Sequence, residues 1–170
     1  MQTIRIREPE LLDLKAFQHA MQNSKVLHYP WIHAPATKEE YLNYLTRYRL
    51  PNHKSFLVCL QSGEIAGVFN ISEIVRGDFQ SAYLGFYAFL DYAGKGYMTQ
   101  GLKLVLEKVF SELELHRLEA NIQPKNKKSI QLVKRCSFRK EGLSPHYLKI
   151  EGEWRDHERW AITLEDWEKI

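Results

Sequence analysis

Cysteine is scarce in this sequence, which has two in 170 residues, Cys59 and Cys136. Each lies in an apolar run with no second cysteine nearby, which argues against a disulfide framework and a CxxC or metal site. The pattern favours two buried free thiols in a reducing compartment. No stretch approaches the ~20 apolar residues of a membrane helix, and the first residues lack the apolar segment of a signal peptide. We therefore expect a cytoplasmic protein with no membrane span.

A strong excess of one charge is also missing, because the formal net charge is only +3. Basic residues between positions 125 and 135 leave RNA or ribosome binding as one alternative. We rank it last, since the excess is small and aromatic residues are not interleaved with the basic cluster. With 44% hydrophobic and 26% charged residues and no linker or repeat, the chain is expected to form a single domain over residues 1–170.

The histidines form no metal motif. Seven of them are scattered along the chain, and His157-Glu158 is followed by Ala161 where a zinc-binding helix needs its second histidine. We therefore expect no metal. Arg155, Asp156 and His157 are interpreted as solvent-facing or structural residues of a strand.

Apolar periodicity predicts an α+β fold, with antiparallel strands first and a strand–helix alternation afterwards. Thr37 and Glu40 form a capping box that starts a helix. Strands are expected at about 3–7, 55–60, 65–75, 81–90, 117–122, 138–150 and 154–164. Helices are expected at roughly 9–17, 37–51, 102–113 and 127–136.

A glycine turn, Gly94-Lys95-Gly96, lies between an aromatic strand and an amphipathic helix. Glycines allow a tight turn, and a helix start offers free N–H groups and a positive dipole end to an anion. A P-loop is excluded because Ser or Thr does not follow Lys95. A dinucleotide fingerprint is excluded because Thr99 occupies the position of its third glycine. A plain strand-to-helix turn is the alternative.

Three stretches resemble the GNAT acetyltransferase superfamily, and locally its RimJ/RimL group, which acetylates the N-termini of ribosomal proteins. The first is Gly94-Lys95-Gly96-Tyr97, although Ala93 and Met98 depart from the usual residues there. The second runs from Asn126 to Ser129 and on to Leu132 and Phe138, and the third comprises 74–85 and 147–157. The resemblance implies a mixed, mostly antiparallel sheet of about seven strands flanked by about four helices.

The resemblance also implies acetyl-CoA as co-substrate. Its pantetheine arm would lie as an added strand against Ala88 and Phe89 and contact Asn126. Its pyrophosphate would lie on the backbone of the glycine turn and helix start. The residues of that seat are Gly94, Lys95, Gly96, Tyr97, Met98 and Thr99. Whether the chain forms a homodimer is left open.

Acetyl transfer to an amine needs a neutral amine, a stabilised oxyanion and a proton for the thiolate. The resemblance implies Ser129 as the acid, with capping or packing as its alternative role. We predict His146 as the base, since histidine titrates near neutral pH, although an ordinary exposed histidine is as good an interpretation. Glu119 is the reserve base, or else a salt-bridge partner of Arg117. A backbone N–H near Ala88 is the expected oxyanion donor.

The acceptor is the largest unknown. A protein N-terminus is preferred, because its amine has a pKa of about 7.7–8.0 and needs less help than lysine. A polyamine, an antibiotic amine or a lysine side chain is an alternative, because one fold serves many acceptors. A non-catalytic acyl-CoA-binding module is another.

Tyr29 and Trp31 lie in a loop that borders the acceptor site in this superfamily. Packing of these two side chains against the core is the simpler role.

Overall fold

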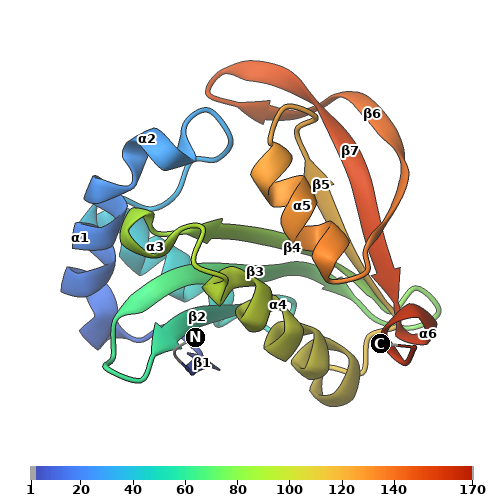
Figure 1. Cartoon of the computed structure of the whole chain (residues 1–170), viewed down its shortest axis with the longest axis horizontal. Coiled ribbons are helices and arrows are strands. Elements are labelled where there is room, and N and C mark those ends of the chain that lie inside the picture. The colour runs from blue at the N-terminus through green and yellow to red at the C-terminus, as the bar shows by residue number, and fades with distance from the viewer. Residues whose placement is uncertain (1–2, 170) are drawn as a thin grey trace.

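The computed structural model describes residues 3–169 and is built on one seven-stranded sheet (Figure 1). The strand order is β1-β2-β3-β4-β5-β7-β6. The strands are β1 (Ile4–Arg7), β2 (Lys54–Leu60), β3 (Ile65–Val75), β4 (Ser81–Ala88), β5 (Arg117–Ile122), β6 (Arg139–Ile150) and β7 (Glu153–Thr163). Neighbouring strands are antiparallel except β4 and β5, which are parallel. The predicted α+β class and mixed sheet are confirmed.

Four main helices flank the sheet, as predicted. They are α1 (Leu14–Asn23), α3 (Lys38–Tyr48), α4 (Tyr97–Glu107) and α5 (Lys127–Arg135), and two single-turn helices are α2 (Lys25–His28) and α6 (Leu164–Trp167). The predicted capping box starts α3, where Thr37 Oγ1 accepts from the Glu40 N–H at 3.1 Å. The α3 helix ends at Tyr48, earlier than expected. None of the helices in the described part of the chain is long and apolar enough to cross a membrane.

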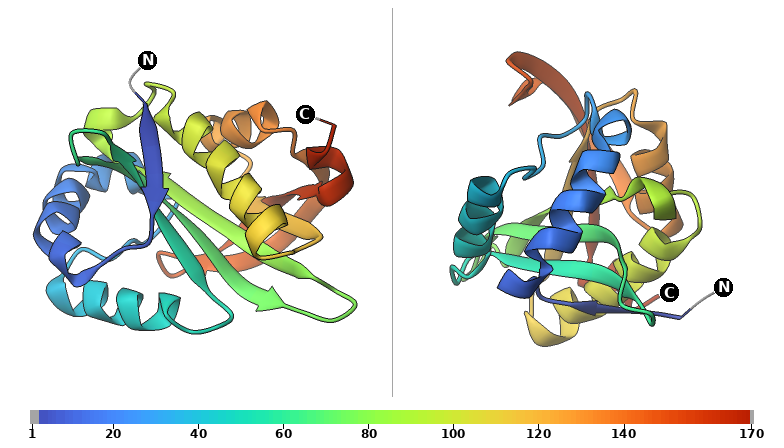
Figure 2. Two further views of the ribbon diagram at one scale, coloured as in Figure 1. Left: turned by 90° about the horizontal axis from the view of Figure 1, so that it is seen from below. Right: turned by 90° about the vertical axis from the view of Figure 1, so that its left-hand side faces the viewer.

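The two faces of the sheet carry different helices. One apolar cluster joins α4 and α5 to the sheet through residues such as Leu102, Val105 and Leu118. The other joins α1 and α3 to the opposite face through Phe17, Tyr41 and Val68. Figure 2 shows the two pairs of helices on opposite sides of the sheet. The face that packs against α4 and α5 and the face that packs against α1 and α3 therefore carry different side chains.

Helix α4 lies close to the sheet because residue 101 is glycine. A Cβ atom at Gly101 would lie 2.8 Å from Val58 Cγ2 and 3.0 Å from Phe69 Cε2, nearer than packed side chains approach. The predicted apolar stripe of this helix is buried at Leu102, Val105 and Leu106. This packing fixes the helix start, which follows the end of β4 after a short 3-10 turn, Leu90–Tyr92.

The sheet splits between β4 and β5. Their pairing covers only three positions, Ser81 with Arg117 through Tyr83 with Glu119. Beyond them the two strands diverge, and α5 lies over the opening (Figure 1). Strand β4 ends at Ala88, two residues before the expected end, because Phe89 O accepts from the Tyr92 N–H at 3.0 Å and starts the 3-10 turn. The split is the place where a ligand can reach both faces of the sheet.

Both cysteines are buried and free, as predicted. Burial raises the pKa of the Cys59 thiol above its ordinary value and that of Cys136 to about 11. Neither thiol is therefore ionised at neutral pH, and neither lines the split. The predicted turn at Glu151-Gly152 joins β6 and β7, with positive φ angles of 50° and 81°.

Candidate active site

A cavity of about 80 Å³ opens in the split and has room for only a few heavy atoms. It is lined by β4, β5, β7, the start of α5 and the segment that precedes α3. The lining residues are Trp31, Ile32, Leu84, Gly85, Phe86, Asn121, Ile122, Gln123, Asn126, Ser129 and His157. Of the predicted site residues, Asn126 and Ser129 line this cavity, and His146 and Glu119 do not.

The start of α5 contributes a free hydroxyl. Asn126 is the N-cap residue, and its Oδ1 accepts from the Ser129 N–H at 3.2 Å. Capping is therefore done by Asn126, which leaves its Nδ2 for other partners. The Ser129 Oγ makes no hydrogen bond within residues 3–169. Ser129 thus presents a hydroxyl to the cavity that the fold does not use.

The glycine turn has the geometry of an anion seat. Gly94 and Gly96 have φ angles of 77° and 84°, which favour glycine, and Gly96 is the N-cap of α4. Because the Gln100 N–H bonds to Gly96 O at 3.2 Å, the N–H groups of residues 97–99 have no partner inside the helix. Lys95 lies over the Tyr92 ring at 5.8 Å. A negatively charged group is stabilised at such a helix start.

The open edge of β4 beyond Tyr83 has one carbonyl already bonded. The Phe89 N–H donates to Ala66 O at 2.9 Å, so the trans peptide directs Ala88 C=O to the other side, toward the split. There it accepts from His28 Nε2 at 2.8 Å. Burial lowers the pKa of His28, so this imidazole is neutral. Both backbone groups of Phe89 are bonded inside the fold, which leaves Ala88 N–H as the nearer group for a ligand.

The opposite face contributes polar side chains from β5 and β7. Register pairs Asn121 with Arg159 and Ile122 with Glu158. One further step in that register puts Gln123 and His157 side by side, and both line the cavity. The Asn121 Oδ1 is buried without a hydrogen-bond partner among the described residues. Buried polar atoms are normally bonded, so this oxygen is available to a ligand or water.

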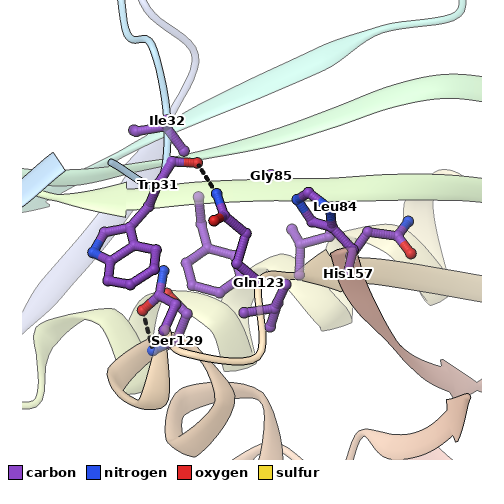
Figure 3. Close-up of a pocket in the computed structure, with 11 residues that line it drawn as sticks. Trp31, Ile32, Leu84, Gly85, Gln123, Ser129 and His157 are labelled. Atoms are coloured by element: carbon purple, nitrogen blue, oxygen red, sulfur yellow. Dashed lines mark hydrogen bonds between the residues drawn. The ribbon is translucent and has the colours of Figure 1, made fainter. Parts of the chain in front are cut away.

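The chain segment before α3 closes one side of the cavity. Trp31 and Ile32 line it, and Gln123 Nε2 donates to the carbonyls of Pro30 and Trp31 at 3.3 and 3.4 Å. Figure 3 shows this bond to Trp31 and the indole beside the start of α5. Trp31 thus borders the cavity, whereas Tyr29 is 67% exposed.

The predicted bases occupy other environments. His146 is exposed on β6, with a φ of 47°, and its N–H donates to Asp156 Oδ1 at 2.8 Å. Glu119 accepts from Arg117 Nη2 at 2.8 Å and from Asn121 Nδ2 at 3.1 Å, so its salt-bridge alternative is confirmed. The Arg117 guanidinium also pairs with Glu141 at 2.6 Å. Both carboxylates are therefore ion-paired with Arg117, and Glu141 also pairs with Arg139 at 3.0 Å.

Sequence reasoning missed His157. Its interpretation as solvent-facing is wrong, because the residue is only 3% exposed. The pairing of β5 with β7, between segments distant in the sequence, places His157 on the same face as Asn121, so no local sequence pattern signals its position. No cluster of three or more His, Cys, Asp or Glu side chains suited to a metal ion occurs in residues 3–169.

Comparison with known proteins identifies related sequences and folds. A family model described as an acetyltransferase (GNAT) domain matches residues 3–139. The ribosomal protein uS5-alanine N-acetyltransferase of Escherichia coli (strain K12) is 42% identical over 104 residues, which are 61% of this chain and 54% of that protein. This chain therefore matches about half the length of that relative. The spermidine N(1)-acetyltransferase of the same strain is 28% identical over 169 residues, 94% of this chain and 86% of that protein.

Two solved structures have the same fold. Mycobacterium smegmatis RimJ in complex with CoA-disulfide has a TM-score of 0.89 at 26% identity, covering 96% of this chain and 83% of that one. Ribosomal-protein-S5-alanine acetyltransferase from Vibrio fischeri has a TM-score of 0.85 at 26% identity, covering 98% and 96%.

Proposed function

Because this chain belongs to the GNAT acetyltransferase family, as its motifs predicted, we propose that it transfers the acetyl group of acetyl-CoA to a primary amine. The observation that carries the proposal is the split between β4 and β5. A free Ser129 hydroxyl lies on one side of its cavity and the segment before α3 on the other. A donor and an acceptor can therefore meet inside the sheet from opposite faces.

The coenzyme would be held mainly by backbone groups. The pyrophosphate would accept from the N–H groups of residues 97–99, with Gly94, Lys95 and Gly96 shaping the turn. The pantetheine arm would add to the open edge of β4 near Ala88 and Phe89 and contact Asn126 Nδ2. Ala88 C=O already accepts a hydrogen bond from His28 Nε2. A hydrogen bond between the pantetheine arm and Ala88 would therefore use the Ala88 N–H. That N–H is also the proposed oxyanion donor.

Ser129 is the proposed acid. As the amine nitrogen attacks the thioester carbon, the C–S bond breaks and the leaving thiolate takes a proton from Ser129 Oγ. A thiol pKa of about 8.5 makes this a modest demand on the acid. The base accepts the amine proton in the same reaction. His146 and Glu119 are the bases predicted from sequence, and their substitution tests them.

The preferred acceptor is a protein N-terminus, including that of a ribosomal protein. The 42% identity to a uS5-alanine N-acetyltransferase supports this choice. A polyamine is the second candidate, because the spermidine N(1)-acetyltransferase matches over 94% of this chain.

An assay of coenzyme A release across a panel of amines tests the proposal. The panel contains Ala- and Ser-starting peptides, an N-terminally blocked peptide with a free lysine, and spermidine. We expect the free N-terminal peptides to have the highest kcat/KM. Faster turnover of spermidine would favour the polyamine alternative. Tight acetyl-CoA binding without turnover on any amine would favour a non-catalytic binding module.

A further inference from the structure

We propose that His157, and neither His146 nor Glu119, is the base that takes the proton from the acceptor amine. This assignment rests on the proposed function. His157 lines the cavity together with Ser129, whereas the other two residues do not. Figure 3 shows the His157 ring and Ser129 apart from each other, with Gln123 between them in that view.

The hydrogen bonds of His157 fix which ring nitrogen can accept a proton. Its Nδ1 lies 2.9 Å from Arg155 O. A carbonyl oxygen only accepts, so Nδ1 carries the hydrogen and Nε2 carries the lone pair. Nε2 has no hydrogen-bond partner within residues 3–169. The fold thus orients the imidazole with its basic nitrogen unused, as a general base requires.

The surroundings of His157 keep the ring neutral. Burial lowers its pKa below the ordinary value, while the Arg155 carbonyl and the Asp156 carboxylate oppose that shift. From β6, the Tyr147 ring lies 5.9 Å away, and burial raises the pKa of that phenol, so it adds no charge. From β5 the neighbours in the cavity lining are uncharged amides, and Glu119 is paired with Arg117.

Acid and base approach the reacting atoms from opposite faces. Ser129 belongs to α5, which covers the face that carries Leu118 and Ile122. His157 is two residues from Arg159, which pairs with Asn121. Because side chains two apart on a strand share a face, His157 lies on the face that carries Asn121. Trp31 and Ile32, which border the cavity, belong to the segment before α3. An amine entering there meets Nε2, while the thioester enters from the α4–α5 face.

The step balances with these two residues. The amine nitrogen forms the C–N bond to the thioester carbon, and its proton moves to His157 Nε2. The C–S bond breaks, and the thiolate receives the Ser129 Oγ proton. Solvent then takes the imidazolium proton and returns one to Ser129. The products are the acetylated amine and coenzyme A, with no further reactant.

The experiment compares His157→Gln with His146→Gln in the full chain, using the best peptide from the amine panel. We expect His157→Gln to lower kcat ~100-fold and to remove the acidic limb of the kcat pH profile, with acetyl-CoA affinity unchanged. His146→Gln tests the base predicted from sequence, and a loss of kcat as large as that expected for His157→Gln would overturn the assignment to His157. In His157→Ala, added imidazole should restore turnover in a saturable manner, which a structural role does not predict.

Labelling histidine with nitrogen-15 gives a test that needs no variant. NMR of the wild-type protein near neutral pH should show His157 neutral, protonated at Nδ1. Protonation at Nε2 instead, or full activity of a folded His157→Gln, overturns the assignment. A wild-type protein that turns over no amine defeats the proposed function, and with it any base role for His157. In an active wild type, full activity of a folded His157→Gln defeats the base assignment alone. If the variants do not fold, protonation at Nε2 in the wild type still overturns the assignment.

Discussion

The half of the site on the α4–α5 face, the proposed coenzyme half, presents backbone N–H groups, a helix start and one serine hydroxyl. The half on the α1–α3 face, the proposed acceptor half, presents side chains. On the first half, residues 97–99 offer N–H groups whatever their side chains are. On the second, Trp31, Gln123 and His157 each contribute a specific ring or amide. The first half is therefore suited to a constant ligand, and the second to a ligand that differs between relatives.

This difference explains how departures from the family pattern are tolerated. Ala93 and Met98 depart from the usual side chains of the motif, while Gly94 and Gly96 have the positive φ angles of a tight turn, 77° and 84°. Met98 also packs against the core, since its Sδ would lie 2.4 Å from a Cβ at Gly67. Side-chain changes on the acceptor half should alter acceptor choice much more strongly. The following predictions test that contrast, from the largest effect to the smallest.

Ser129→Ala should lower kcat ~100-fold, the lower end of what a positioned acid contributes. The KM for acetyl-CoA should not change, because the hydroxyl makes no hydrogen bond to the described residues 3–169 that its loss would disturb. Steady-state coenzyme A release measures both constants. Lys128→Ala, an exposed neighbour on the same helix, is the control and should keep its rate. Full activity of Ser129→Ala would remove the only side chain assigned to chemistry on the coenzyme half.

Gly96→Val should raise the KM for acetyl-CoA by about tenfold or more, because a β-branched residue at a φ of 84° costs about 1–3 kcal/mol. The strain displaces the N–H groups at the start of α4. Gly77→Val is the matched control, since Gly77 has a φ of 70° in the turn before β4, at the opposite end of that strand from Ala88. It should lower the melting temperature without changing KM. Equal KM changes in both variants would contradict a pyrophosphate seat at Gly96.

Trp31→Ala should raise the KM for the acceptor about 30-fold, because an aromatic contact buried by the ligand contributes about 2 kcal/mol. The KM for acetyl-CoA should stay the same, which sharpens the contrast between the halves. Trp154→Ala removes a tryptophan that is 59% exposed on β7 and serves as control. Initial-rate kinetics with each substrate varied in turn separate the two constants. A rise in the acetyl-CoA KM alone would place Trp31 on the coenzyme half.

Glu40→Gln should lower the melting temperature at neutral pH by about 2–4 °C at most. Hydrogen bonds from the N–H groups of Ala36 and Thr37 lower the pKa of Glu40 to about 2, although its side chain is 39% exposed and solvent screens it. Because the folded pKa lies below the unfolded one, the stabilisation is complete above about pH 4.5. It is lost as the pH falls toward about 2.

Thermal unfolding of wild type and Glu40→Gln between pH 7 and pH 2.5 measures this loss as a shrinking difference. Glu39→Gln, in the same first turn of α3, should show a smaller and less pH-dependent difference. A constant difference across this range would mean that the carboxylate does not stabilise the segment before α3.

The backbone geometry of the proposed coenzyme half was predictable from sequence because its signals are local. Glycine spacing, the apolar stripe of α4 and the pattern Asn126 to Ser129 each lie within a few residues. The acceptor half depends on contacts between distant segments. His157 meets Gln123 only through the register of β5 with β7, and Gln123 meets Trp31 across 92 positions. No window of sequence contains that information, so His157 was assigned to a solvent-facing or structural role.

The break between β4 and β5 has a consequence for the way the sheet meets other chains. An unpaired strand edge at the margin of a sheet recruits foreign strands and promotes aggregation. Here the unpaired part of β4 lies inside the sheet, with β3 on one side, β5 on the other and α5 across the opening. The fold thus keeps unpaired backbone groups of β4 away from the margin of the sheet, where they would favour association with foreign strands.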